Sequence, residues 1–147
     1  MGETTPPSFT TARILVVDDF EPWRRSVCSI LQAQRQLFVV GEAANGLEAV
    51  QKAQELKADL ILLDIRLPAL NGIEAAKRIR QVVAGVKIVF VTQHRDLDTV
   101  RVALATGAQG YVWKADAGRD LLPAIEAVLR GENFVSSRLK GQGPDSH

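Results

Sequence analysis

Five short runs of apolar residues recur along the chain, separated by longer stretches of mixed polarity. Within each run the apolar residues are continuous rather than alternating, which is typical of parallel strands that are covered on both faces. The runs span Ile14–Val17, Phe38–Gly41, Leu60–Leu63, Ile88–Val91 and Gly110–Val112. The pattern therefore predicts five buried strands.

The stretches between and after the runs carry apolar residues at helical spacing, and capping signals mark where helices begin and end. The first predicted helix opens at Pro22, the second follows Asn45 and the third follows Asn71. The fourth and fifth span about residues 97–105 and 118–129, and a glycine lies just beyond each. Five strand–helix repeats with right-handed crossovers predict an α/β fold with an open, doubly wound parallel sheet.

Length and composition fit one ordinary domain. The chain has 147 residues, of which 46% are hydrophobic, so it can build a core. We expect an N-terminal leader over residues 1–11, the domain over 12–131, and a C-terminal tail or linker start over 132–147. The net charge of +1 gives no general attraction to nucleic acid or anionic membrane, and no apolar stretch has membrane-spanning length. With a single cysteine, Cys28, these features predict a cytoplasmic protein.

Polar residues suited to metal and phosphate chemistry stand at the ends of four predicted strands. Asp18 and Asp19 follow the first strand, Asp64 the third, Thr92 the fourth and Lys114 the fifth. Because ligands of such sheets gather at the carboxyl ends of the strands, we expect these side chains to lie close together. Clustered carboxylates favour Mg2+, which completes its coordination with phosphate oxygens, and a lysine can hold a further phosphate oxygen. A carboxylate can also act as a nucleophile toward phosphorus.

Any one of these aspartates taken alone is explained as an ordinary loop residue after a strand. The whole set, however, resembles the receiver domain of two-component response regulators over about residues 13–136. Ala115 stands where many receivers have proline. That proline is commonly absent from the LuxR-type, or NarL-FixJ, branch, which this chain therefore resembles more closely. The resemblance implies a flavodoxin-like five-stranded sheet of order 2-1-3-4-5 with five surrounding helices. It is carried by Leu15-Val16-Val17-Asp18-Asp19, Asp64-Ile65-Arg66-Leu67-Pro68 with Asn71-Gly72, Val91-Thr92, and Gly107-Ala108-Gln109-Gly110-Tyr111-Val112-Trp113-Lys114.

The resemblance also implies how the site works. Asp64 accepts a phosphoryl group from a histidine kinase or a phosphotransfer protein. Asp19 and Asp64 ligate Mg2+ directly, Asp18 acts mainly through a metal-bound water, and the backbone carbonyl of Arg66 is a third protein ligand. Lys114 pairs with Asp64 at rest and with the phosphoryl group afterwards.

The same resemblance implies a switch. Thr92 swings toward the phosphoryl oxygen, and Tyr111 turns inward into the space that Thr92 leaves. The surface that responds comprises the fourth helix, the fifth strand and the fifth helix. The resemblance leaves open whether a homodimer forms through that face. Direct binding of nucleic acid or of a membrane by this chain is not expected.

Three residues at the rim of the site can each be interpreted in two ways. Gln93 stands where receivers usually have a small residue. Its side chain either crowds the path to Asp64 or hydrogen-bonds the phosphoryl group, or it points to solvent. Arg66 and His94 lie two residues past Asp64 and Thr92, where family members flank the route of the hydrolytic water. We hypothesise that they narrow this route and set the phosphoryl lifetime; the alternative is that both are solvated loop side chains.

Two aromatic residues and the cysteine are interpreted as packing residues. We expect Trp113 to fill the core under the fifth helix, although an exposed Trp113 would instead suit an interface. We expect Trp23 to pack near the acidic pair rather than to contact a ligand. Cys28 is expected to be a small core residue of the first helix.

Functions of other classes fit the sequence less well. A phosphatase of the haloacid-dehalogenase type needs a second acid two residues after its nucleophile, where this chain has Arg66 or Phe20. A nucleotide or flavin binder would carry a glycine-rich loop after the first strand. We therefore expect a phosphoacceptor signalling domain rather than an enzyme acting on a separate substrate. The alternatives are the regulatory half of a longer LuxR-type DNA-binding transcription regulator, or a pseudo-receiver that works without phosphorylation.

Overall fold

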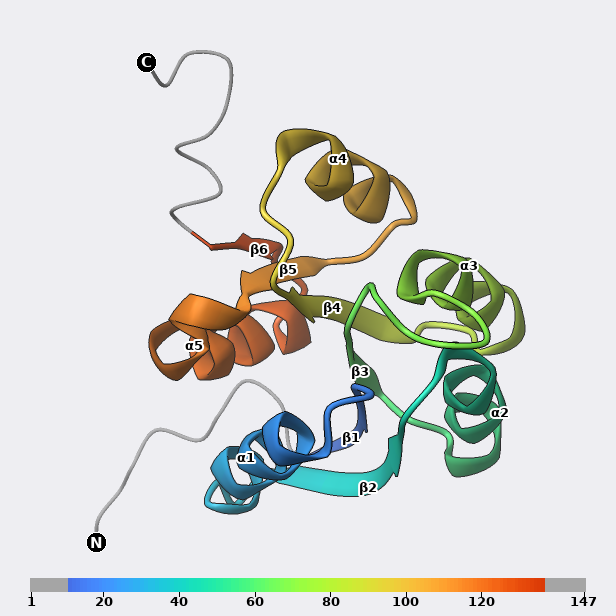
Figure 1. Ribbon diagram of the computed structural model, residues 1–147. Helices are drawn as coiled ribbons and strands as arrows, with labels where there is room; N and C mark the ends of the chain where they lie inside the picture. Colours follow the sequence, from blue (N-terminus) through green and yellow to red (C-terminus); the bar gives the residue numbers. More distant parts are fainter. Residues whose placement is uncertain (1–10, 137–147) are drawn as a thin grey trace, which may run out of the picture.

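A single parallel sheet forms the centre of the molecule (Figure 1). The computed structural model describes residues 11–136, and within them six strands lie in the order β2-β1-β3-β4-β5-β6. The predicted α/β fold and the order of its first five strands are confirmed; the first ten residues of the predicted leader and residues 137–147 lie outside the described range. The strands are β1 Ala12–Val17, β2 Leu37–Ala43, β3 Leu60–Leu63, β4 Lys87–Thr92, β5 Gly110–Trp113 and β6 Phe134–Val135.

Five helices cover both faces of the sheet. Helices α1 and α5 pack on one face and α2, α3 and α4 on the other, so that two separate apolar cores sandwich the strands (Figure 1). Asn45 caps α2 as predicted, and Asn71, which the sequence placed just before the third helix, caps α3; each side chain accepts a hydrogen bond from the backbone N–H three residues on. The helices are α1 Glu21–Gln32, α2 Gly46–Leu56, α3 Gly72–Val82, α4 Leu97–Ala105 and α5 Ala117–Leu129, the last preceded by the 3-10 turn η1 Lys114–Asp116.

The sixth strand is a feature that the sequence pattern did not predict. Phe134 and Val135 pair in parallel with Gly110 and Tyr111 of β5. The backbone N–H of Ser136 continues the ladder by donating to the carbonyl of Tyr111 at 2.9 Å. A strand of two residues is too short to produce a recognisable apolar run, so only the pairing with β5 reveals it.

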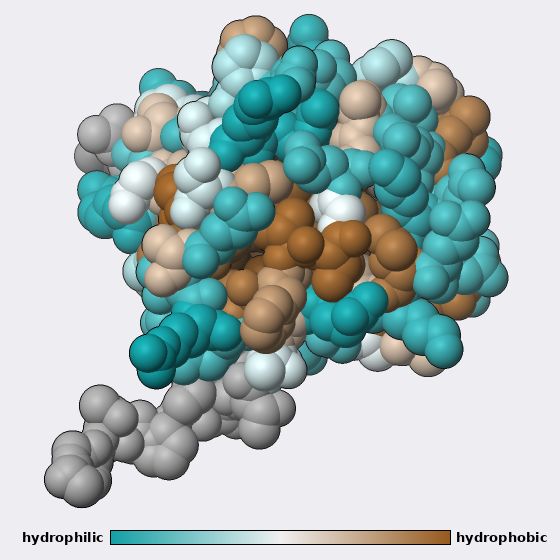
Figure 2. Space-filling view, turned by 90° about the horizontal axis from the view of Figure 1, so that it is seen from below, coloured by the Kyte–Doolittle hydropathy of each residue, from teal (hydrophilic) through white to brown (hydrophobic). Residues whose placement is uncertain are grey.

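The sheet has an open edge at β2. Seen from below, on the side where α1 and β2 lie in Figure 1, apolar side chains form a band bordered by polar ones (Figure 2). On β2 itself, Phe38 is 50% exposed and pairs with Arg13 near the start of β1. Phe38 therefore lies toward the amino end of the sheet, away from the acidic residues at its carboxyl end.

Among the described residues, no helix is both long and apolar enough to cross a membrane.

Candidate phosphoryl and metal site

The carboxyl ends of β1 and β3 bring three aspartates together, as the sequence predicted. Asp18, Asp19 and Asp64 each offer a carboxylate oxygen, and these oxygens lie within 4.8 Å of one another. Asp18 and Asp64 are buried, whereas Asp19 is exposed at the mouth of the site. Oxygen ligands at this spacing, with one side open, suit a hard divalent cation such as Mg2+, which keeps several waters or phosphate oxygens in its coordination sphere.

Lys114 is shared between two of these carboxylates rather than paired with Asp64 alone. Its Nζ lies 2.6 Å from Asp18 Oδ2 and 3.1 Å from Asp64 Oδ2. Burial raises the pKa of Asp18, and the charge of Asp64 adds to this effect, although Lys114 and the N–H of Phe20 favour the ionised carboxylate. Burial alone would lower the pKa of Lys114, but the hydrogen bond to Asp18 and the charge of Asp64 raise it overall. A cationic ammonium therefore stands beside two carboxylates that repel each other.

Close packing between β3 and α3 fixes the position of Asp64. The carboxylate of Asp64 accepts a hydrogen bond from the N–H of Ile65 at 2.7 Å. Helix α3 begins directly against this loop, and the N–H of Gly72 donates to the carbonyl of Ile65 at 2.7 Å. A Cβ atom on residue 72 would lie 1.9 Å from the carbonyl oxygen of Asp64, so only glycine allows this approach. The Asn71-Gly72 pair of the sequence motif thus supports the acidic residue.

Thr92 and the residues after it form the side of the site that lies at the end of β4. Thr92 is fully buried at the end of β4, and its hydroxyl accepts a hydrogen bond from the N–H of His94 at 3.3 Å. The side chains of Arg66 and His94 meet, with Arg66 Nε donating to His94 Nε2 at 2.9 Å. Gln93 is exposed and lines the same shallow hollow as Lys114. The structure therefore brings Arg66 and His94 into contact, whereas Gln93 lies in a separate hollow.

Tyr111 already occupies the inward position that the resemblance assigned to the switched state. Its side chain is fully buried, and its hydroxyl donates to the backbone carbonyl of His94 at 2.7 Å. Burial raises the pKa of Tyr111 well above its usual value. Tyr111 thereby links β5 to the loop that follows Thr92.

The expectation for Trp113 is wrong. Trp113 packs against the core on the α4 side of the sheet, not under α5, and the guanidinium of Arg95 lies 4.6 Å from its ring centre. The reason is strand alternation: Tyr111 and Trp113 share one face of β5, and Val112 between them faces the core under α5. Cys28 is buried in the core beneath α1, as predicted.

Two residues of α1 contribute to the site in ways that the sequence pattern did not indicate. Lys114 Nζ lies 5.2 Å from the ring centre of Trp23, so Trp23 packs on the core and also faces the ammonium. Arg24 Nη1 donates to the backbone carbonyl of Asp18 at 2.7 Å. Sequence spacing gave no signal for either contact, because both depend on how α1 turns back over the end of β1.

The whole domain is similar to known signalling proteins. Residues 14–126 match the family described as the response regulator receiver domain. The transcriptional regulatory protein LiaR of Bacillus subtilis is 35% identical over 130 residues, covering 88% of this chain and 62% of LiaR. The response regulator protein VraR of Staphylococcus aureus is 37% identical over 123 residues, covering 84% of this chain and 59% of VraR. The chain thus spans about three fifths of the length of these relatives.

Solved structures agree with this similarity. A two-component response regulator of the LuxR family from Aurantimonas superposes with a TM-score of 0.86 at 34% identity, covering 90% of this chain and 94% of that one. The response regulator domain of Thermotoga maritima CheB superposes with a TM-score of 0.73 at 36% identity, covering 82% and 95% of the two chains.

Proposed function

We propose that Asp64 accepts a phosphoryl group from a phosphohistidine, because this chain belongs to the response regulator receiver domain family and its acidic site offers the groups that this reaction needs. The observation that carries the proposal is the meeting of Asp18, Asp19 and Asp64, with the ammonium of Lys114 paired to Asp18 and Asp64. The donor is a histidine kinase or a phosphotransfer protein. The alternative of a pseudo-receiver lacks support, since none of these groups is missing.

The chemistry follows from the positions of the side chains. A carboxylate oxygen of Asp64 attacks phosphorus, an O–P bond forms, and the P–N bond to the histidine breaks. Asp18, Asp19, Asp64 and the backbone carbonyl of Arg66 would hold Mg2+, which when bound neutralises charge on the phosphoryl oxygens. Lys114 then transfers its hydrogen bond from Asp64 to a phosphoryl oxygen.

We propose that the switch runs through Thr92 and the loop that follows β4. The hydroxyl of Thr92 leaves the N–H of His94 and donates to another phosphoryl oxygen. Since Tyr111 is hydrogen-bonded to the carbonyl of His94, a shift of this loop changes how Tyr111 and α4 pack. The response reaches the surface of α4, β5 and α5, which we propose as the site of regulated protein contacts, including a homodimer.

Phosphorylation at Asp64 is tested by intact mass. We expect the protein to gain the mass of one phosphoryl group when incubated with Mg2+ and acetyl phosphate, and to lose this gain on chelation of Mg2+ beforehand. The Asp64→Ala variant should gain none. The matched control is Asp98→Ala, which removes an exposed carboxylate from the first turn of α4 and should be phosphorylated as the wild type is. Equal gain in Asp64→Ala, or no gain in any protein, would overturn the assignment.

The contact between Arg66 and His94 is proposed to set the phosphoryl lifetime by narrowing the path of the hydrolytic water. Arg66→Ala should speed phosphate loss by about tenfold, which corresponds to about 1.4 kcal/mol of barrier. The measurement is the decay of the phosphorylated mass after removal of the phosphodonor. Lys77→Ala is the control, because Lys77 lines the same hollow but pairs with Glu74. An unchanged decay rate in Arg66→Ala would contradict the proposal.

A second candidate role concerns a longer protein. The relatives LiaR and LnrK of Bacillus subtilis are named transcriptional regulatory proteins, and this chain matches 62% and 59% of their lengths. We propose that this domain can serve as the regulatory half of such a regulator, working in the cytoplasm, with DNA contacts made outside the described residues. Electrophoretic mobility shifts with this chain alone should show no DNA binding at physiological salt.

A further inference from the structure

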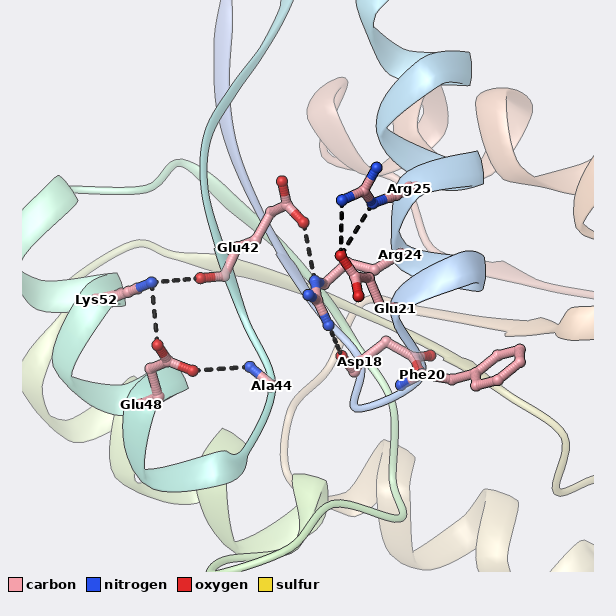
Figure 3. Close-up of polar contacts among 9 residues, drawn as sticks. All are labelled: Asp18, Phe20, Glu21, Arg24, Arg25, Glu42, Ala44, Glu48 and Lys52. Carbon is pink, nitrogen blue, oxygen red and sulfur yellow. Dashed lines mark hydrogen bonds and ion pairs between the residues drawn. The ribbon is translucent and has the colours of Figure 1, made fainter.

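A charged side chain behind the acidic site is held between two elements. Arg24, in the first turns of α1, donates through Nε to Glu42 Oε1 at 2.8 Å and through Nη1 to the backbone carbonyl of Asp18 at 2.7 Å (Figure 3). The side chain of Arg24 is only 16% exposed. A planar guanidinium offers donors in fixed directions, so it can hold two acceptors at once in a defined geometry.

The carbonyl that Arg24 holds has a special position. It belongs to the peptide that joins Asp18 to Asp19, so its direction helps to set where both carboxylates point. The side chain of Asp18 is held in addition by the N–H of Phe20, which donates to Oδ1 at 2.9 Å (Figure 3). The loop that carries two of the three acidic ligands is therefore fixed from its backbone and from one side chain.

Glu42, the side-chain acceptor of Arg24, is itself held in place by α2. Lys52 of α2 donates to the backbone carbonyl of Glu42 at 2.6 Å and lies 3.1 Å from Glu48 Oε2. Glu48 in turn accepts a hydrogen bond from the N–H of Ala44 at 2.8 Å (Figure 3). These contacts form one continuous polar network from α2, across the end of β2, to α1. Arg24 thus connects the acidic loop to two elements of the scaffold.

We propose that Arg24 is a positioning residue for the metal-binding carboxylates, acting through the backbone of Asp18 and supported by Glu42. The inference rests on the proposed function, because it concerns the same Mg2+ site. Partners that orient metal ligands contribute strongly to metal affinity, and their loss typically weakens binding by about 10- to 100-fold. Arg24 lies behind the site and takes no part in the transfer of the phosphoryl group.

The sign of the effect separates positioning from simple electrostatics. Removing the positive charge of Arg24 from behind the acidic site would, by electrostatics alone, strengthen the binding of Mg2+ there. Loss of a positioning contact would weaken it. A fall in Mg2+ affinity on removing a cation is therefore not explained by charge.

Arg25 provides a matched control on the same helix. Its side chain is 75% exposed and pairs with Glu21 on the preceding turn at 2.8 Å. Arg25→Ala removes the same charge from α1 without touching the Asp18 carbonyl. Arg24→Lys keeps the charge but replaces the fork by one ammonium group, which cannot reproduce both contacts in the same geometry.

The test is the dissociation constant of Mg2+, measured by calorimetry and by tryptophan fluorescence, for the wild type, Arg24→Ala, Arg24→Lys, Arg25→Ala and Asp19→Asn. We expect the constant to rise about tenfold in Arg24→Ala and at least about threefold in Arg24→Lys, with Arg25→Ala within about twofold of wild type. Thermal unfolding in EDTA accompanies each titration. Saturating Mg2+ should restore most of the phosphorylation rate with acetyl phosphate in Arg24→Ala.

Each outcome has a distinct meaning. If Arg24→Ala binds Mg2+ as tightly as wild type or more tightly, or if Arg24→Lys binds as wild type does, positioning by the guanidinium is overturned. If affinity falls only in proportion to the loss of thermal stability in EDTA, across both Arg24 variants, Arg24 is a stability residue and the inference also fails. If wild type and Asp19→Asn bind equally, the proposed metal site itself fails, independently of Arg24.

Discussion

Helices α4 and α5 follow β4, which ends in Thr92, and β5, which Lys114 follows directly, yet they are held very differently. Helix α5 buries seven of its thirteen residues, whereas α4 buries two of nine. Because removal of apolar surface from water is the main favourable term in folding, α5 is fixed to the sheet much more firmly than α4. Segments with few buried apolar contacts are the ones that open or shift at low cost.

The contacts at the ends of the two helices strengthen this contrast. At the start of α5, the hydroxyl of Ser136 accepts a hydrogen bond from the N–H of Trp113 at 3.1 Å and is also bonded to Asp120, which joins β5, β6 and α5. The loops that flank α4 are held by hydrogen bonds from Tyr111 to the carbonyl of His94 and from Arg80 to the carbonyl of Thr106. Lys114 therefore emerges from the fixed half of the molecule, while Thr92 leads into the adjustable half. A change at Asp64 is expected to move α4 first.

The largest effect is expected when one apolar side chain of each helix is truncated. Leu121 of α5 is 1% exposed, and Leu121→Ala should lower the free energy of unfolding by about 2–5 kcal/mol, since it leaves a cavity. Val102 of α4 is 50% exposed, and Val102→Ala should cost less than about 0.5 kcal/mol. Urea unfolding monitored by circular dichroism measures both. Equal losses would show that the two helices are held alike.

A smaller effect is expected where α4 is tied to α3. Arg80 donates to the carbonyls of Val86, Thr106 and Gly107, just before β4 and just after α4. Arg80→Ala should cost about 2 kcal/mol, because hydrogen bonds from a charged donor are lost. Hydrogen exchange should rise mainly over residues 97–107, with α5 unchanged. The exposed Arg78 on the same helix is the control, and a uniform rise along the chain would contradict a local role.

The smallest expected effect concerns pH and the contact between α5 and β6. The hydrogen bond from Arg119 lowers the pKa of Asp120, and the hydroxyl of Ser136 adds to this. A carboxyl whose folded-state pKa is lowered stabilises the protein above its unfolded pKa, and this is lost as pH falls through the folded value. The free energy of unfolding of the wild type should exceed that of Asp120→Asn by about 0.5–1 kcal/mol near neutral pH. The difference is small because Arg119 is largely exposed, so solvent screens its interaction with Asp120. In urea titrations the difference should shrink as the pH falls below 3.8, the ordinary pKa of the carboxyl, and vanish below its folded-state pKa; a pH-independent difference would exclude this cause.

Much of the site could be predicted because its parts lie at the ends of strongly patterned strands. The runs before Asp18 and Asp64 identify strands, and parallel topology places their carboxyl ends on one edge of the sheet. The Asn45 and Asn71 caps are likewise local signals of three or four residues. Trp113 was misplaced because its face depends on strand alternation relative to the surrounding helices. Strand β6 was missed because two residues carry no periodicity.

The sequence by itself determined which segments become the first five strands and the five helices, and which acids, hydroxyl and amine stand at the strand ends, since both depend on neighbours along the chain. The tertiary structure decided that Lys114 is shared by Asp18 and Asp64, that Arg66 meets His94, and that Arg24 holds the backbone of Asp18. These contacts join residues 6 to 96 positions apart or depend on the angle at which a helix leaves its strand. Only the packing of the helices on the twisted sheet fixes such directions to within a hydrogen bond.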